Sequence, residues 1–249
     1  MSFFNKIFNK KEEISSPLDL SLIRTDLHSH LLPGIDDGVA SYEESIEIIS
    51  QLKFLGYEKI ITTPHIMADF FKNTPAIING KLDVLKKKLI EANIPITIVA
   101  AAEYLVDDGL SDIINSHEML TFGDNKVLIE LSFMNPPPNF NNIVFDLQIN
   151  GYKVVIAHPE RYLYWVNDFE KFEDLKSRGV FFQMNLASLS GYYSPQVKKL
   201  AEKMIDCDMI DIVGTDIHSM KYIPEFNIAQ HNPYLEKLLF SGRLINQIL

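Results

Sequence analysis

From residue 21 onward, short apolar runs rich in β-branched residues alternate with segments of helical periodicity, and this alternation constrains the fold more than any other feature. A strand that is joined to the next one through a helix normally lies parallel to it, so the pattern predicts a parallel sheet covered by helices. The 249 residues are close to the size of about 250 residues that is usual for one (β/α) barrel. No glycine-rich phosphate loop follows any of the runs, which argues against the alternative of an open sheet that binds a dinucleotide. We therefore expect an α/β fold with a closed or distorted barrel of the TIM type.

The predicted elements cover most of the chain. Strands are predicted at 22–25, 59–62, 96–100, 126–131, 153–157, 180–184 and 210–213. Helices are predicted at 41–52, 77–91, 110–117, 142–150, 169–177, 194–207 and 233–247. Ser41 begins the first helix, and Glu44 three residues later gives the pattern of a capping box. No linker divides this region, so we expect a single domain over residues 21–249.

Residues 1–20 differ from the rest of the chain and are expected to form an N-terminal arm. Four apolar side chains of this arm share one helical stripe, namely Phe3, Phe4, Ile7 and Phe8. The arm is either a frayed tail or a short amphipathic segment that docks on a partner or at a membrane surface.

Composition excludes several classes of partner and site. The 23 basic and 33 acidic residues give a net charge of −10, which argues against nucleic acid as a partner. The single cysteine, Cys207, allows neither an internal disulfide nor a thiolate zinc site, and it fits a reducing cytoplasm. The chain lacks both a secretory signal and an apolar run of about 18 residues, so we expect no transmembrane segment and a cytoplasmic protein.

Histidines and acidic residues follow the predicted strands almost one after another. They are His28 and His30 after the first strand, His65 after the second, Glu103 and Glu130 after the third and fourth, His158 after the fifth, and Asp216 and His218 after the seventh. Each motif alone is more often a packed or solvated side chain than a ligand. In a barrel, however, the carboxyl ends of all strands meet at one face, so the whole set should line one cleft. Imidazoles and carboxylates without cysteine suit manganese, iron or zinc, and the set is large enough for two or three ions.

The motifs DLHSHLLPGIDDG (26–38), TPH, AAEY, LIEL, AHPER, QMNLASLSG and GTDIHS resemble those of the polymerase and histidinol phosphatase (PHP) superfamily. Within it, the chain is similar to the CpsB/CapC-type capsular polysaccharide tyrosine-protein phosphatases, over roughly residues 22–249. The resemblance implies a distorted (β/α)7 barrel, the PHP fold, with three divalent metal ions. Manganese is the expected metal, with iron or zinc as alternatives.

The resemblance also implies roles for individual residues. The first ion would be held by His28, His30, Glu103 and Asp216, the second by Glu103, Glu130 and His158, and the third by Asp37, His65 and His218. Asp37, rather than Asp36, matches the family's ligand, and Arg161 matches the arginine that contacts the substrate phosphate. Lys221 stands close to where the family often has a further arginine. Phe70 and Phe71 would form an aromatic wall for a phenyl ring, or would only fasten their loop to the barrel.

These residues predict a metal-dependent phosphomonoesterase, in which a metal-bound hydroxide attacks the phosphate. The resemblance implies a protein-tyrosine phosphatase whose substrate is a tyrosine autokinase of polysaccharide export. Two alternatives remain: a small-molecule phosphatase such as a histidinol-phosphate phosphatase, and a non-catalytic metal-binding scaffold. A thiol phosphatase is excluded because Cys207 has no arginine six residues later.

Overall fold

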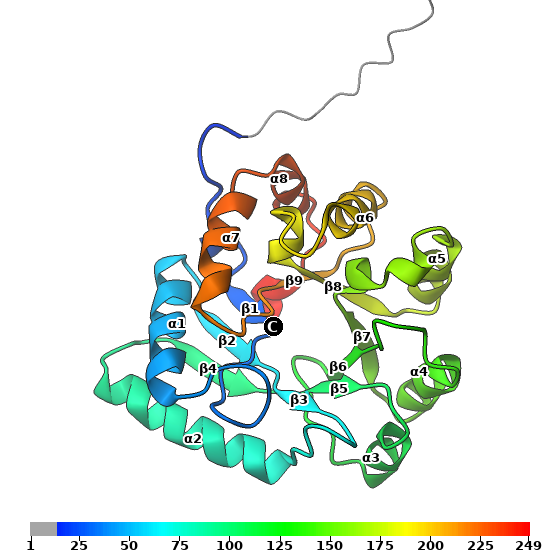
Figure 1. The fold of residues 1–249 in the computed structure, drawn as a ribbon, viewed down its shortest axis with the longest axis horizontal. Coiled ribbons are helices and arrows are strands. Elements are labelled where there is room, and N and C mark those ends of the chain that lie inside the picture. The colour runs from blue at the N-terminus through cyan, green and yellow to red at the C-terminus, as the bar shows by residue number, and fades with distance from the viewer. Residues whose placement is uncertain (1–13) are drawn as a thin grey trace, which may run out of the picture.

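Short parallel strands enclosed by helices make up the computed structural model, which describes residues 14–249 (Figure 1). The strands are β1 (Thr25–Leu27), β2 (Lys59–Thr62), β3 (His65–Ile66), β4 (Thr97–Ala100), β5 (Glu103–Leu105), β6 (Lys126–Glu130), β7 (Lys153–Ala157), β8 (Phe181–Asn185) and β9 (Ile212–Gly214). They form two sheets, with the orders β1-β2-β4 and β3-β5-β6-β7-β8-β9. Every pair of neighbours in both sheets is parallel, as the alternation of apolar runs and helices predicts.

The division into two sheets arises where two predicted strands are interrupted. Thr63 and Pro64 separate β2 from β3, and two alanines separate β4 from β5. At the other side, β1 and β9 approach each other, and Asp216 N donates a hydrogen bond to His28 O at 2.7 Å just beyond these strands. Residues 14–249 therefore do not form one continuous closed barrel, and they have a mixed α/β fold with two parallel sheets.

Helices lie around the outside of the strands (Figure 1). They are α1 (Tyr42–Phe54), α2 (Pro75–Glu91), α3 (Leu110–Ser116), α4 (Phe140–Ile149), α5 (Glu170–Ser177), α6 (Pro195–Asp206), α7 (Ile223–Ala229) and α8 (Pro233–Leu239). The capping prediction is confirmed, since the Ser41 side chain accepts a hydrogen bond from Glu44 N at 3.2 Å. The helices bury apolar side chains, as α1 does through Ile48, Ile49 and Leu52.

The predicted elements differ most from the structure in three places. The first strand is not 22–25: a 3-10 helix occupies Leu20–Leu22, and β1 begins at Thr25. The last helix does not continue to residue 247, because α8 ends at Leu239 and the chain then turns through Gly242, whose φ of 71° is left-handed. Helix α7, which is seven residues long, was not predicted.

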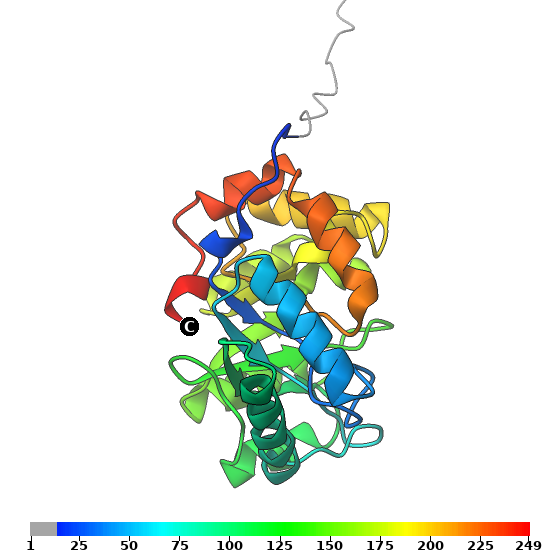
Figure 2. The same cartoon turned by 90° about the vertical axis from the view of Figure 1, so that its left-hand side faces the viewer.

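The C-terminal segment closes one end of the strands. A small apolar cluster that includes Leu27, Leu128 and Val155 packs against Ile245 and Leu249. The buried Asn246 side chain accepts from Val213 N and donates to Thr25 O and Val213 O, which ties β1 to β9. In Figure 1 the C-terminus lies in the middle of the strands, and in Figure 2 it lies at one side of the molecule. The opposite end of the strands is where their carboxyl ends open.

Part of the expected N-terminal arm lies in the described region. Ile14 N donates to His231 O at 3.0 Å, Leu18 N donates to Gln230 O at 2.9 Å, and Leu20 is fully buried. The apolar stripe of Phe3, Phe4, Ile7 and Phe8 lies outside the described residues. Among residues 14–249, none of the helices combines the length and apolarity needed to cross a bilayer.

Candidate metal centre

The nine predicted ligands gather around the carboxyl ends of β1, β2, β4, β6, β7 and β9, and His65 and Glu103 are also the first residues of β3 and β5. The backbone at several of these positions adopts unusual conformations. His28, His158 and Asp216 have positive φ values of 86°, 33° and 50°. Such values are uncommon for residues other than glycine and concentrate at functional sites. The backbones of β1 and β9 also lie close together here: a Cβ added to Gly214 would be 2.0 Å from Leu27 O, so only glycine fits at this position. The backbone is therefore locally strained at the three residues with positive φ, whose side chains belong to the cluster.

His28 and His30 are held by partners behind their rings. His28 Nδ1 lies 2.7 Å from Gln183 Oε1, and His30 Nδ1 lies 2.8 Å from Asp36 Oδ2. Both histidines are fully buried. A histidine that donates from Nδ1 to such an acceptor presents an unprotonated Nε2 to a metal ion. Asp36 therefore supports a ligand from behind, while its neighbour Asp37 lies in the cluster itself.

Carboxylates and imidazoles approach each other at ligand-like separations. His28 Nε2 lies 2.9 Å from Glu103 Oε2 and 3.2 Å from Asp216 Oδ1. His30 Nε2 lies 3.4 and 3.5 Å from the same two oxygens. Two ligands placed about 2.1 Å from one tetrahedral ion are about 3.4 Å apart. The first predicted ligand set is thus brought together by the fold.

The second and third predicted sets are also brought together, with one difference in grouping. His158 Nε2 lies 3.3 Å from Glu103 Oε1 and 3.5 Å from Glu130 Oε1. Glu103 and Glu130 also form a group with His65, whose Nδ1 lies 3.2 Å from Glu103 Oε2 and 3.8 Å from Glu130 Oε2. Since groups share members, the side chains form one connected cluster rather than separate sites.

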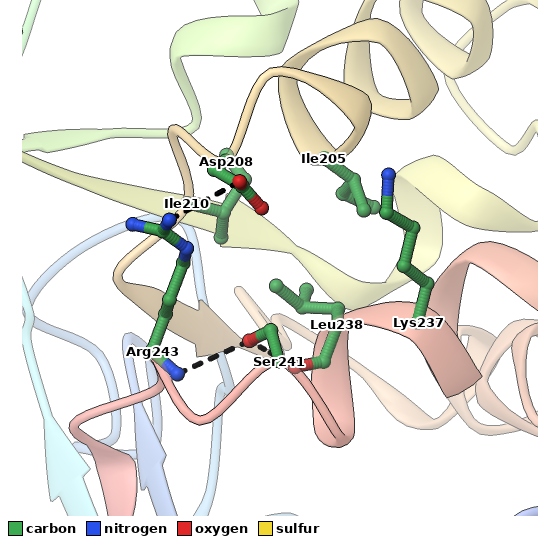
Figure 3. Close-up of a pocket in the computed structure, with 7 residues that line it drawn as sticks. All are labelled: Ile205, Asp208, Ile210, Lys237, Leu238, Ser241 and Arg243. Atoms are coloured by element: carbon green, nitrogen blue, oxygen red, sulfur yellow. Dashed lines mark hydrogen bonds and ion pairs between the residues drawn. The ribbon is translucent and has the colours of Figure 1, made fainter.

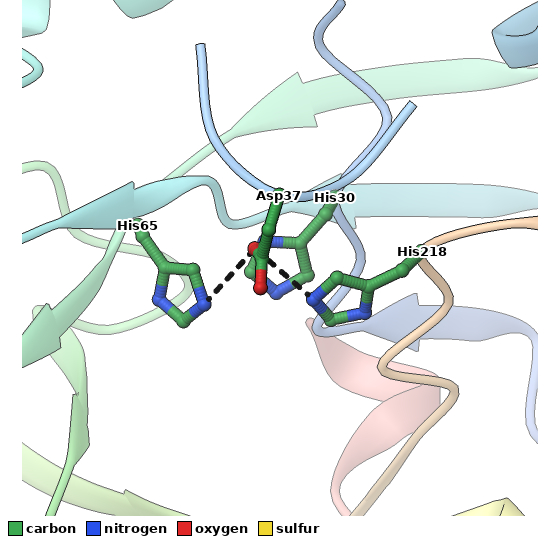
Figure 4. A group of neighbouring side chains, drawn as sticks. All are labelled: His30, Asp37, His65 and His218. Carbon is green, nitrogen blue, oxygen red and sulfur yellow. Dashed lines mark ion pairs between the residues drawn. The ribbon is translucent and has the colours of Figure 1, made fainter. Parts of the chain in front are cut away.

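Asp37 occupies the middle of the third set. Figure 4 shows its carboxylate between the rings of His65 and His218, with His30 behind. Asp37 Oδ1 lies 3.5 Å from His65 Nε2 and 3.4 Å from His218 Nε2. The Asp37 side chain is 57% exposed, so this set lies at the mouth of the site.

Burial and neighbouring charges raise the pKa of one residue of the cluster and lower the pKa values of two others. Burial and then the carboxylates of Glu103 and Asp216 raise the pKa of Glu130 well above its usual value. Burial followed by the charge of Arg161 lowers the pKa of His158 to about 4. The hydrogen bond to His218 lowers the pKa of Asp37 to about 2. A neutral imidazole beside competing carboxylates is an arrangement that bound cations would stabilise.

Several buried donor and acceptor atoms of the cluster have no hydrogen-bond partner. They are His30 Nε2, His65 Nδ1, Glu103 Oε1 and His158 Nδ1. Buried polar atoms are normally paired. Three of these four, His30 Nε2, His65 Nδ1 and Glu103 Oε1, face other members of the cluster, where a bound cation would give them a partner. The donor set contains only imidazoles and carboxylates, which fits manganese, iron or zinc.

Arg161 borders this cluster. Its guanidinium Nη1 donates to Asp216 Oδ2 at 3.2 Å, and its side chain is 23% exposed. The position follows from the short 3-10 helix Pro159–Arg161 that comes directly after His158. A partly exposed arginine next to potential metal ligands can bind a phosphate oxygen.

The three residues proposed to contact the substrate, Phe70, Phe71 and Lys221, differ in how they are placed relative to the cluster. Phe71 stacks on His65, with ring centroids 5.7 Å apart and an angle of 9° between the rings. Phe70 is 79% exposed, and Lys221 is exposed in the 3-10 helix Met220–Tyr222. Only Phe71 of these three therefore has a ring contact with a predicted ligand.

Strand β8 contributes residues that sequence reasoning missed. Gln183 supports His28, and Asn185 Nδ2 donates to Asp216 Oδ2 at 2.7 Å. The Gln183 amide also donates to Asn185 Oδ1 at 2.9 Å, so the two amides link two predicted ligands. The signal available in the sequence was two polar residues at alternate positions of an otherwise apolar run, which places both side chains on one face.

A pocket at the opposite end of the strands is unrelated to this cluster. Figure 3 shows it between α6 and α8, with an ion pair between Arg243 and Asp208 at its edge. Its cavity of about 10 Å³ is close to the space needed for one water molecule. Its lining residues Ile205, Asp208 and Ile210 come before β9, whereas Asp216 and His218 of the cluster come after it.

Comparisons with known proteins agree with this site. The family model described as "Capsular polysaccharide synthesis, CpsB/CapC" matches residues 24–239. Tyrosine-protein phosphatase YwqE from Bacillus subtilis is 30% identical over 221 residues, which are 84% of this chain and 87% of that protein. Putative tyrosine-protein phosphatase CapC from Staphylococcus aureus is 28% identical over 219 residues, 88% of this chain and 82% of that protein.

The fold agrees with a solved structure as well. The match belongs to the crystal structures of YwqE from Bacillus subtilis and CpsB from Streptococcus pneumoniae, described as unique metal-dependent tyrosine phosphatases. It has a TM-score of 0.78 at 30% identity and covers 86% of each chain. The resemblance seen in the sequence motifs is confirmed, and the chain belongs to the CpsB/CapC family.

Proposed function

We propose that this protein is a metal-dependent protein-tyrosine phosphatase. The observation that carries the proposal is the position of Arg161, whose Nη1 lies 3.2 Å from Asp216 in a cluster of imidazoles and carboxylates. A phosphate needs positive charge around its oxygens as it is transferred, and this arrangement offers it from a side chain and from bound cations. The relatives named as tyrosine-protein phosphatases support the same assignment.

The nine side chains fit a centre of three divalent ions, with manganese as the expected metal. The proposed ligands are His28, His30, Asp37, His65, Glu103, Glu130, His158, Asp216 and His218. Their unpaired buried atoms and their separations near 3.4 Å support this set. When bound, such ions supply Lewis acidity towards phosphate oxygens and lower the pKa of a coordinated water towards about 7.

Residues of the chain itself would bind and orient the substrate. Arg161 can offer its planar donors to two phosphate oxygens, which a lysine cannot match. Phe71, which stacks on His65, would lie beside the substrate's phenyl ring, and the exposed Phe70 and Lys221 would contact the surrounding polypeptide. A tyrosine phenolate, with a pKa of about 10, is a better leaving group than a serine alkoxide, so little help from a general acid is needed.

Two finer statements belong to the same proposal. The seven parallel runs would correspond to a distorted (β/α)7 barrel in which β2 continues into β3 and β4 into β5. The physiological substrate would be a phosphotyrosine protein, with a tyrosine autokinase of polysaccharide export as the expected partner. The description of the matching family, capsular polysaccharide synthesis, supports this choice.

The test compares substrates on the purified protein loaded with Mn²⁺. A phosphotyrosine peptide should be hydrolysed much faster than the matched phosphoserine peptide and than histidinol phosphate, and a chelator should abolish turnover. Arg161→Lys should lower kcat/KM while metal content stays unchanged, whereas Arg178→Lys, on the surface, should do neither. Faster turnover of histidinol phosphate would instead favour a small-molecule phosphatase. Metal-loaded protein that hydrolyses no aryl phosphate would favour a scaffold.

A further inference from the structure

Two aromatic rings lie against the guanidinium group of Arg161. The Cζ atom is 4.4 Å from the ring centroid of Phe133 and 4.3 Å from that of Tyr193. Both distances are well inside the range of about 6 Å for a cation–π contact. Phe133 belongs to the loop after β6 and Tyr193 to the loop before α6, so segments that follow three neighbouring strands, β6, β7 and β8, meet at this group.

These rings are themselves fixed by contacts with the site. The Tyr193 hydroxyl accepts from Asn185 Nδ2 at 3.0 Å and donates to Asp216 Oδ2 at 3.4 Å. Phe133 lies 5.5 Å from the His158 ring with an angle of 26°. Phe133 nevertheless remains 46% exposed, so one edge of this ring borders solvent at the site.

We propose that Phe133 and Tyr193, here called the ring pair, are positioning residues that hold Arg161 in the orientation in which it binds the substrate phosphate. This inference rests on the role of Arg161 under the proposed function. The rings restrict rotation of the guanidinium plane, while the bond from Nη1 to Asp216 fixes one edge. The remaining N–H groups would then bind phosphate with little further loss of side-chain entropy. No ring needs to touch the substrate for this effect.

The inference is tested first by binding of inorganic phosphate to the full-length, Mn²⁺-loaded protein. Phe133→Leu keeps an apolar side chain but removes the π face, so phosphate should bind roughly five-fold more weakly, within the range of one cation–π contact. Tyr193→Leu should have a similar effect, and Tyr193→Phe should recover most of the loss. Tyr164→Leu is the matched control, because this ring stacks on Tyr162 and not on Arg161.

A double-mutant cycle separates positioning from direct contact. In an Arg161→Ala background, Phe133→Leu should cause no further loss of phosphate affinity. With wild-type Arg161, Phe133→Leu should lower kcat/KM equally for phenyl phosphate and for glycerol 2-phosphate. A loss confined to phenyl phosphate, or one that persists without Arg161, would overturn the inference, since Phe133 would then touch the substrate. A fall in metal content would also overturn it, because Phe133 would then act through His158.

A further readout does not depend on turnover. Only four arginines occur in the chain, so the Nε–Hε resonance of Arg161 can be assigned by its loss in Arg161→Lys. Its exchange with water should be slow in the wild type and faster in Phe133→Leu. Unchanged exchange would refute the ring pair. If the wild type failed to hydrolyse phosphotyrosine, the proposed function would fail while the binding and exchange measurements still decided this inference.

Discussion

Gln183 offers the sharpest test of how the site is built, because it is buried, lies behind a ligand and is not itself a ligand. Its Oε1 lies 2.7 Å from His28 Nδ1, and both side chains are fully buried. Metal binding at His28 Nε2 requires the ring proton on Nδ1, where Gln183 accepts it. We therefore expect Gln183→Leu to weaken metal binding and to leave the fold intact.

The size of the expected loss of metal affinity depends on which ring nitrogen of His28 carries the proton. Without metal, the His28 proton can move to Nε2 and donate to Glu103 Oε2, which is 2.9 Å away. With metal bound, it must stay on Nδ1, where Gln183→Leu leaves it buried and unpaired. A buried donor without an acceptor costs about 1–3 kcal/mol, so metal affinity should fall about 10- to 100-fold, the range for loss of such a partner.

The assay is competition for Mn²⁺ between a fluorescent chelator and the metal-stripped, full-length protein. Gln148→Leu is the matched control: it also loses one amide hydrogen bond, from Nε2 to Arg178 O at 2.8 Å, but far from the cluster. Gln183→Glu keeps an acceptor in place and should recover part of the affinity. Equal affinities for Gln183→Leu and the wild type, with thermal unfolding showing both folded, would refute the reasoning. So would an equal loss in Gln148→Leu.

Four further outcomes are expected. Glu103→Gln removes the carboxylate charge at the centre of the cluster, so elemental analysis should show lost metal together with lost turnover; a variant that keeps its full metal content would exclude Glu103 as a ligand. Although burial opposes the charge, Asp36 raises the pKa of His30 well above 6.5, so metal uptake near pH 7 should release protons, and calorimetry in buffers of different ionisation enthalpy should count about one or more. For the same reason charged His30 stabilises the metal-free protein fully below pH about 6.5, and this contribution is lost as the pH rises through the raised value; stability of the metal-stripped protein that does not decline over this range would contradict it. Cys207→Ser should leave kcat/KM unchanged, because this thiol is exposed and no arginine follows at the required spacing; a large loss would point to thiol chemistry.

The alternation of apolar runs and helices made most of the fold predictable. Strand β7 was predicted with its exact bounds, and the Ser41 cap was predicted from two residues. The interruption at Thr63 and Pro64 was not predictable. The sequence predicts a strand at 59–62 with a loop after it, and the two residues of β3 lie in that predicted loop. The short helix α7 was missed, although α3, which has the same length, was predicted.

The candidate site was predictable in part because its members follow strand ends. Parallel strands bring such positions together whatever their separation in sequence, which is how His28 comes to lie 3.2 Å from Asp216. The partners behind the ligands could not be found in this way. Gln183 and Phe133 carry no metal-ligand chemistry, and their roles depend on distances of a few ångströms that no spacing rule specifies.

The two ends of the strands differ in how they contribute to stability, and this difference bears on metal binding. Where the C-terminal segment covers one end of the strands, apolar side chains pack together and the Asn246 side chain is fully hydrogen-bonded. At the other end, three ligand residues have positive φ, each at a cost of about 1–3 kcal/mol, and buried carboxylates repel one another. The core must supply that free energy in the metal-free protein. Cations bound among these carboxylates would remove the repulsion, so metal should raise the Tm chiefly by stabilising the ligand end.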